Sequence, residues 1–268
     1  MTPRLSRYPL LLLAASALFF GAAYFTVRFP NIPGTGIASF VSTLLIALPS
    51  FIALWRYLGP NRAVLSLLVL SAFGYAIEST GVVTGFPYGP FYYGNALGPK
   101  VAGLVPYLLP LSWVPLVLGA VAATAPTAPE NENVSRRSVP WVLYAAVLLT
   151  LVDGVLDPGA TSLGFWVWPE DGPYYGVPVS NYLGWLFSSS VAAAILLVLG
   201  RRRWRSVPPL PGLLDSALVA VAFWVGVDLF SGLLLPAVLG IALFFYLLGR
   251  RAQLSFKAQS RGEKRGKV

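Results

Sequence analysis

The chain has 268 residues, of which 56% are hydrophobic and 11% charged, and its mean hydropathy is +0.71. These values are typical of a protein that spans a membrane several times rather than of a soluble domain. The chain contains no cysteine and no histidine, which excludes thiolate nucleophiles, iron–sulfur clusters, histidine-ligated zinc or iron, and a Ser-His-Asp triad. Acid–base chemistry must therefore come from Asp, Glu or Tyr.

Eight apolar stretches are each long enough to cross the ~30 Å hydrocarbon core of a bilayer. They lie at residues 9–27, 36–58, 61–82, 101–124, 138–157, 180–200, 210–230 and 233–249. We therefore expect an all-α, polytopic membrane helix bundle of about eight transmembrane helices. Residues 1–249 form a single domain in this prediction, followed by a basic tail at 250–268. The first stretch is long and lacks a clear cleavage site, which favours a retained signal anchor.

Lysine and arginine are distributed unevenly along this predicted topology. With a cytoplasmic N-terminus, 17 of the 19 basic residues fall on the inner side, and only Arg28 and Lys100 fall on the outer side. This asymmetry predicts that both termini are cytoplasmic and that the protein lies in the cell membrane. The asymmetry also accounts for the net charge of +9, since the basic tail is expected to be a topology anchor that lies near anionic lipid. No basic domain with interleaved aromatic residues lies outside the predicted helices, so we expect no nucleic-acid partner.

Four acidic residues lie near the outer ends of the third, fifth and seventh stretches: Glu78, Asp153, Asp157 and Asp228. A charged group at membrane depth costs about 2.5–3.5 kcal/mol on the insertion scale, so such groups normally face a cavity or the bundle interior. We therefore consider these four as candidate catalytic residues. The alternative for any single one is that it caps a helix end or lies in the outer headgroup layer. Asp215, at the inner end of the seventh stretch, is expected to be a helix-start residue.

Asp153 and Asp157 are separated by one helical turn and therefore lie on the same helix face. Two carboxylates so placed repel each other, and the outer side offers only Lys100 and Arg28 as counter-charges. One of the pair is therefore expected to hold a proton at neutral pH. Such a pair beside an apolar cavity is suited to acid catalysis. We expect Pro158 to end this helix.

Small and polar residues recur at helical spacing on three of the stretches, which predicts close packing around a shared cavity. They are Ser71, Gly74, Tyr75, Glu78 and Gly81 on the third, Thr150, Asp153, Gly154 and Asp157 on the fifth, and Asn181, Trp185 and Ser188 on the sixth. The fourth stretch contains Pro106, Pro110 and Pro115. We expect that helix to be bent or broken.

Two outer loops, 85–100 and 159–181, are dense in aromatic residues and in Gly or Pro. An interfacial aromatic belt would also place Trp and Tyr here. The aromatic faces could instead stabilise a carbocation, by about 2 kcal/mol each when desolvated, or bind a long polyene. The substrate-binding candidates are Tyr75 on the third stretch and, from the loops, Tyr88, Tyr92, Trp166, Trp168 and Tyr175.

Three segments carry a resemblance to a known family: ESTGVVTGFPYGPFYYGNALG (78–98), VDGVLDPGA (152–160) and WVWPEDGPYYGVPVSNYLGW (166–185). They resemble the integral-membrane carotenoid 1,2-hydratases of bacteria and haloarchaea. The matched positions imply Glu78, Asp153, Asp157, Asn181 and Trp185 as site residues, whereas Asp228 rests on its predicted depth. Tyr88 stands where the family has Phe more often, a substitution that is expected to tolerate the same role.

The resemblance implies a reaction that needs no cofactor and no metal, with a carotenoid and water as substrates and membrane lipid as surroundings. Water adds to the terminal 1,2 double bond of an acyclic ψ end group, as in lycopene or γ-carotene, and gives a tertiary alcohol. A carboxylic acid would protonate C-2, and a second carboxylate would deprotonate the water that attacks the cation at C-1. An oxygen-dependent membrane hydroxylase is disfavoured, because such enzymes hold iron with histidine clusters.

Three other functions stay open at this stage. An intramembrane prenyltransferase could use DGVLD (153–157) to hold Mg²⁺ and a diphosphate. The chain has no second Asp-rich motif, however, and few cations at the outer face. A proton-coupled transporter would also carry intramembrane carboxylates and broken helices. A carotenoid-binding protein without catalytic activity is the third alternative.

Overall fold

The computed structural model describes residues 8–30, 35–126 and 134–265 of the chain. Arg4, Arg7 and Lys267, which contribute to the charge asymmetry, lie outside the described residues. The helices are α1 (Tyr8–Arg28), α2 (Thr35–Leu58), α3 (Pro60–Thr84), α4 (Leu109–Ala123), α5 (Val134–Ser162), α6 (Val179–Leu199), α7 (Arg201–Ser206), the 3₁₀ turn η1 (Pro211–Leu214), α8 (Asp215–Phe230) and α9 (Leu234–Arg265). The short strands are β1 (Tyr92–Tyr93), β2 (Lys100–Val101), β3 (Val105–Pro106) and β4 (Trp166–Val167).

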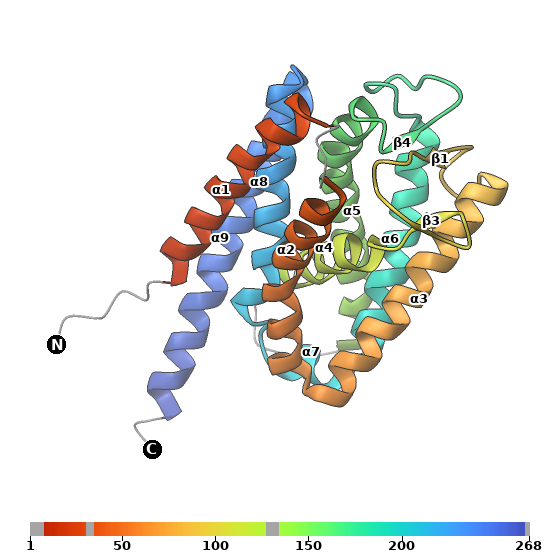
Figure 1. Cartoon of the computed structure of the whole chain (residues 1–268). Helices are drawn as coiled ribbons and strands as arrows, with labels where there is room; N and C mark the ends of the chain where they lie inside the picture. Colours follow the sequence, from red (N-terminus) through yellow and green to blue (C-terminus); the bar gives the residue numbers. More distant parts are fainter. Residues whose placement is uncertain (1–7, 31–34, 127–133, 266–268) are drawn as a thin grey trace.

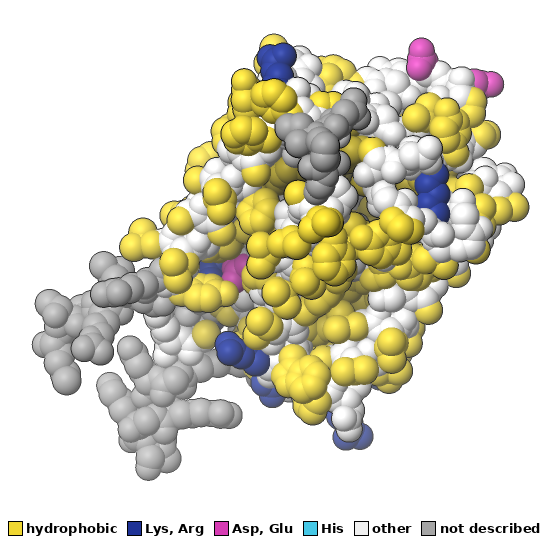
Figure 2. Space-filling model, viewed as in Figure 1, with side chains coloured by type: hydrophobic (Ala, Val, Ile, Leu, Met, Phe, Trp, Pro, Cys, Tyr) yellow, Lys and Arg dark blue, Asp and Glu magenta, His cyan; other side chains and the backbone are white. Residues whose placement is uncertain are grey.

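Seven helices in the described residues are long and apolar enough to cross a membrane: α1, α2, α3, α5, α6, η1 with α8, and α9. Hydrophobic side chains cover most of the visible face, and charged side chains appear mainly toward its edges (Figure 2). Leu11, Val83 and Phe245, for example, are 65%, 67% and 65% exposed, as lipid-facing residues would be. The all-α polytopic bundle expected from the sequence is confirmed.

The eighth predicted span, at 101–124, differs from the prediction. Its first residues form an antiparallel hairpin of β2 and β3, and α4 has only 15 residues, a rise of about 22 Å. Every residue from Trp113 to Ala123 is buried, because α4 lies at mid-height among α2, α5 and α6 (Figure 1). A helix that is apolar on all sides is either buried in protein or faces lipid, and hydropathy alone does not distinguish the two.

The start of α1 and the end of α9 lie at the same end of the bundle (Figure 1). Helices α3 and α5 both end toward the other end of the bundle, so the segment between them, with the β2–β3 hairpin and α4, returns the chain without a full-length helix. That both termini are cytoplasmic stays a prediction. The C-terminal ends of α3, α5 and α8 lie toward the opposite end, together with β1 and β4. This arrangement gathers the predicted carboxylates at one level.

Helix α5 continues through Pro158 to Ser162, so the prediction that Pro158 ends the helix is wrong. Proline has no N–H and leaves the carbonyl four residues earlier without its helical donor. That carbonyl belongs to Gly154, and the Tyr174 hydroxyl donates a hydrogen bond to it at 3.1 Å. The loop after α5 thus compensates for the proline, and the helix extends one further turn.

A buried ion pair ties three helices together at the end where α1 begins. Arg251 Nε on α9 donates to Asp215 Oδ1 at 2.5 Å, and the Tyr8 hydroxyl on α1 donates to Asp215 Oδ2 at 2.9 Å. The neighbouring Arg250 donates to the carbonyl of Ala123, the last residue of α4, and to that of Ala125 just after it. Helix α9 therefore continues through the predicted boundary at residue 250, and the first two residues of the basic tail pack into the bundle.

Candidate active site

An asparagine on α6 joins the two aspartates of α5. Asn181 Nδ2 donates to Asp153 Oδ2 at 3.2 Å and also to Asp157 Oδ2. All three side chains are at most 3% exposed. The helical spacing of the two aspartates places both on the face that α6 covers, as predicted. Asp153 Oδ1 is buried and has no hydrogen-bond partner among the described residues.

Glu78, near the C-terminal end of α3, lies under the first aromatic loop. The Tyr93 hydroxyl donates to Glu78 Oε2 at 2.8 Å, and both side chains are buried. Tyr93 lies on β1, which pairs antiparallel with β4 so that Tyr93 is opposite Trp166. The Trp166 side chain in turn interacts with Asp157. This two-stranded pairing connects the loop over α3 with the loop over α5.

Tyr88 is inserted between α3 and α6, where only glycine leaves room for its ring. A methyl group at Gly81 would lie 2.8 Å from Tyr88 Cδ2, and one at Gly184 would lie 2.6 Å from Tyr88 Cδ1. The buried Tyr88 hydroxyl interacts with Ser188 and Glu78. Burial raises the pKa of this phenol well above its usual range, and the charges of Glu78 and Asp153 act in the same direction.

The carboxylates of α3 and α5 act on Tyr93 as they do on Tyr88. Burial raises the pKa of its phenol well above the usual range, and the charges of Glu78 and then Asp157 add to the effect. Tyr93 therefore stays protonated and acts as a hydrogen-bond donor. Since Glu78 and one of the two aspartates act on each of Tyr88 and Tyr93, the three carboxylates lie close to the same pair of phenols.

Aromatic rings enclose this region on the loop side. Phe91 lies 5.5 Å from Tyr93 and 6.2 Å from Trp168, between ring centroids, and Trp185 lies 6.5 Å from Tyr88. These rings, with Trp166 packed against them, form a cluster around Tyr88 and Tyr93. A charge formed beside these rings would therefore face aromatic carbon as well as the three carboxylates.

Three of the predicted binding residues lie away from the carboxylates. Tyr92 is on the opposite face of β1 from Tyr93 and is 53% exposed. Tyr175 is 41% exposed, in the left-handed backbone conformation of the tight turn that joins residues 172 and 176. Tyr75 is half-buried one turn before Glu78, and its hydroxyl donates to the carbonyl of Tyr107 at 2.7 Å.

Asp228 is at the predicted depth but on another side of α5. A methyl group at Gly159 would lie 2.9 Å from Asp228 Oδ1, and Gly159 is rotated about 200° around the helix from Asp157. Asp228 is fully buried, and neither carboxylate oxygen has a hydrogen-bond partner among the described residues. Its charge acts on Tyr174, whose pKa is raised to about 12, mainly by burial. The structure therefore does not bring Asp228 into contact with the Asp153–Asp157 pair.

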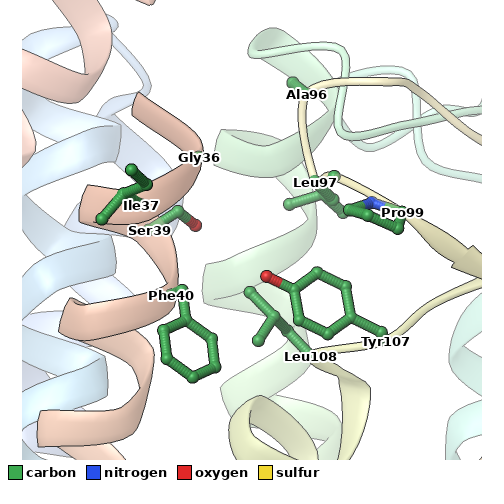
Figure 3. Close-up of a pocket in the computed structure, with 10 residues that line it drawn as sticks. Gly36, Ile37, Ser39, Phe40, Ala96, Leu97, Pro99, Tyr107 and Leu108 are labelled. Carbon is green, nitrogen blue, oxygen red and sulfur yellow. The ribbon is translucent and has the colours of Figure 1, made fainter. Parts of the chain in front are cut away.

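An apolar cavity of about 400 Å³ lies beside this site, between the first turns of α2 and the segment 96–108 (Figure 3). Phe40 and Tyr107 stack at its side with ring centroids 6.3 Å apart. None of the three clustered carboxylates lines it. These carboxylates are at most 6% exposed, so a substrate reaches them only when neighbouring side chains or loops move.

Sequence reasoning did not select Tyr93, the hydrogen-bond donor to Glu78, although it selected the adjacent Tyr92. A signal was available, because successive residues of a strand point to opposite faces and only one of the two tyrosines can point inward. It also did not select Tyr174, whose hydroxyl compensates for Pro158. Lys100, considered as a counter-charge for the aspartates, instead donates to the carbonyl of Tyr93 at 2.5 Å.

Comparison with known proteins identifies the family. A family model described as carotenoid biosynthesis protein matches residues 34–247. The chain belongs to this carotenoid biosynthesis family. The matched region contains every predicted site residue but excludes α1 and the Asp215 partner Arg251.

The chain is also similar to the bisanhydrobacterioruberin hydratase of Haloarcula japonica, to which it is 42% identical over 176 residues. The alignment covers 63% of this chain and 57% of the length of that relative. No solved structure matches the chain.

Proposed function

We propose that the protein hydrates the terminal 1,2 double bond of an acyclic ψ end group of a carotenoid, of the lycopene or γ-carotene type, to a tertiary alcohol. The family and the name of the Haloarcula relative support carotenoid hydration. The observation that carries the proposal is that Glu78, Asp153 and Asp157 are buried together beside the aromatic cluster around Tyr88 and Tyr93. Hydration of an unactivated alkene needs a proton donor, a shielded cation and a base, and this cluster contains side chains suited to each role.

The Asp153–Asp157 pair is the proposed proton donor. Two carboxyl groups held by the same amide in a dry site repel each other when both are ionised, and one shared proton removes that repulsion. Asn181 donates a hydrogen bond to one oxygen of each aspartate. Asp153 Oδ1 has no hydrogen-bond partner in the part of the chain that the structure describes, so it is the oxygen from which we assign proton transfer to C-2.

Protonation at C-2 leaves a tertiary cation at C-1, which the aromatic cluster is suited to stabilise. A cation over the face of Trp or Tyr gains up to about 2 kcal/mol when desolvated. Tyr88, Tyr93 and Trp168 are all at most 8% exposed, so bulk water is excluded from these rings. Because bulk water is excluded, the cation at C-1 is captured mainly by a water that the base deprotonates.

Glu78 is the proposed base. It accepts a hydrogen bond from Tyr93, and a carboxylate in that position can take a proton from an attacking water. A water oxygen forms the C–O bond to C-1 as Glu78 takes one of its protons, and the other proton stays in the hydroxyl group. The hydrogen added at C-2 comes from the Asp153–Asp157 pair, and the proton on Glu78 returns to that pair before the next turnover. No electron is transferred, and no oxidant or reductant is required.

Production of the protein in a host that makes lycopene tests this function. We expect a hydroxylated carotenoid that is absent from the host alone, with a yield that EDTA leaves unchanged in isolated membranes. A prenylated product that depends on Mg²⁺ would support the prenyltransferase alternative. Carotenoid that is bound or moved but chemically unchanged would support a binding protein or a transporter, and either result would overturn the proposal.

A further inference from the structure

We propose that Tyr93 is a positioning residue for the reaction: its hydroxyl holds the carboxylate of Glu78 in the orientation that deprotonates the attacking water. The inference rests on the proposed function and goes beyond it, because it assigns a role to a hydroxyl group outside the proposed acid, base and cation-stabilising faces. Tyr93 does not itself need to touch the carotenoid.

The geometry of the bond supports this role. The distance from Tyr93 Oη to Glu78 Oε2 is 2.8 Å, and the two side chains are 8% and 6% exposed. A hydrogen bond to a charged group in such surroundings is shorter and about twice as strong as a neutral one. Glutamate has three side-chain torsions, so a single fixed donor removes much of its freedom. The carboxylate is thereby oriented before the substrate arrives.

Tyr93 is itself held in place from two directions. Its carbonyl accepts a hydrogen bond from Lys100 Nζ, which fastens the end of β1 to β2. Its pairing with Trp166 fastens β1 to β4, and the two rings meet edge-on with centroids 6.2 Å apart. Because Trp166 also interacts with Asp157, the β1–β4 pair fixes the base on α3 relative to the proton donor on α5.

Loss of the Tyr93 hydroxyl should therefore affect water capture more than protonation. If Glu78 is misplaced, the cation at C-1 still forms, but water captures it less often. More of the cation then loses a proton and becomes an alkene again. In D₂O the returning alkene carries deuterium, either at C-2 of recovered substrate or in a double-bond isomer. The ratio of deuterated alkene to alcohol thus reports how the cation is partitioned.

The experiment compares Tyr93→Phe with Tyr57→Phe in membranes supplied with lycopene in D₂O. Tyr57 is a matched control, since it is 2% exposed and its hydroxyl donates to backbone carbonyls, of Val207 at 2.7 Å and of Arg203 at 3.3 Å, away from the carboxylates of the site. We expect Tyr93→Phe to form alcohol at least 10-fold more slowly, with an unchanged KM and a ratio of deuterated alkene to alcohol raised about 10-fold. Glu78→Gln should shift the ratio in the same direction, and Tyr57→Phe should match the wild type.

A merely structural role would lower alcohol and deuterated alkene together and leave their ratio unchanged, and that outcome would overturn the inference. Wild-type rates in Tyr93→Phe would also overturn it. If the wild type itself makes no alcohol, the proposed function fails instead. The two failures are therefore distinguishable within one experiment.

Discussion

Gly184→Ala tests whether the close contact between α6 and the loop at residues 85–100 positions the side chains of the site. The added methyl group would lie 2.6 Å from Tyr88 Cδ1, 2.7 Å from the Pro87 oxygen and 2.8 Å from the Pro87 carbonyl carbon. Two of these neighbours are backbone atoms, so the clash is relieved only if α6 and the loop move apart. Overpacking of this kind typically costs about 1–3 kcal/mol.

The gain in helix propensity from Gly to Ala, up to about 1 kcal/mol, does not offset that cost fully. We therefore expect a net destabilisation of about 1–2 kcal/mol. Hydration should fall more steeply, because the movement displaces Tyr88 on one side and Asn181, one turn earlier on α6, on the other. Thermal unfolding in detergent and alcohol formation in membranes measure the two effects.

Gly21→Ala is the control, since a methyl group at Gly21 meets nothing within 4 Å on α1. It should be neutral or slightly stabilising and should leave hydration unchanged. If Gly184→Ala is as stable and as active as Gly21→Ala, the packing of Tyr88 between the helices does not support the site.

Three further changes follow from the same structure. Asp153→Asn and Glu78→Gln should lower hydration by about 10²–10⁴-fold while the protein still accumulates in the membrane, because the amides keep shape but exchange no proton; wild-type activity in both would remove their roles. Asp215→Asn should lower the free energy of unfolding by about 3–5 kcal/mol, since it leaves Arg251 buried without its counter-charge. Activity per folded molecule should persist, and a loss of turnover in intact protein would contradict this. Reporter fusions after residues 132 and 205 should read as cytoplasmic and one after residue 171 as external; an external signal after residue 205 would reverse the proposed orientation.

Much of the site is predictable from spacing alone. Asp153 and Asp157 share a face because they are one turn apart, and Asn181 meets them because the short 163–178 connection returns the chain beside α5. The depth of Glu78 follows from its place near the end of a membrane span. These predictions use only helical periodicity and the thickness of the bilayer, which do not depend on tertiary contacts.

The remaining features depend on contacts between distant segments. Tyr93 rather than Tyr92 faces Glu78 because β1 pairs with β4, some 70 residues later, and a two-residue strand has too little pattern to reveal its inward face. Depth places Asp228 level with the other carboxylates but says nothing of which side of α5 it meets. Hydropathy likewise does not distinguish a short helix enclosed by protein, such as α4, from a membrane span.

The most direct test of the central claim is the isotope content of the product formed in water labelled with both ¹⁸O and deuterium, under ordinary O₂. Addition of water by carboxylate acid–base catalysis predicts one ¹⁸O in the tertiary hydroxyl and one deuterium at C-2 of the same molecule. A hydroxyl oxygen drawn from O₂, or an alcohol without deuterium at C-2, would contradict the account.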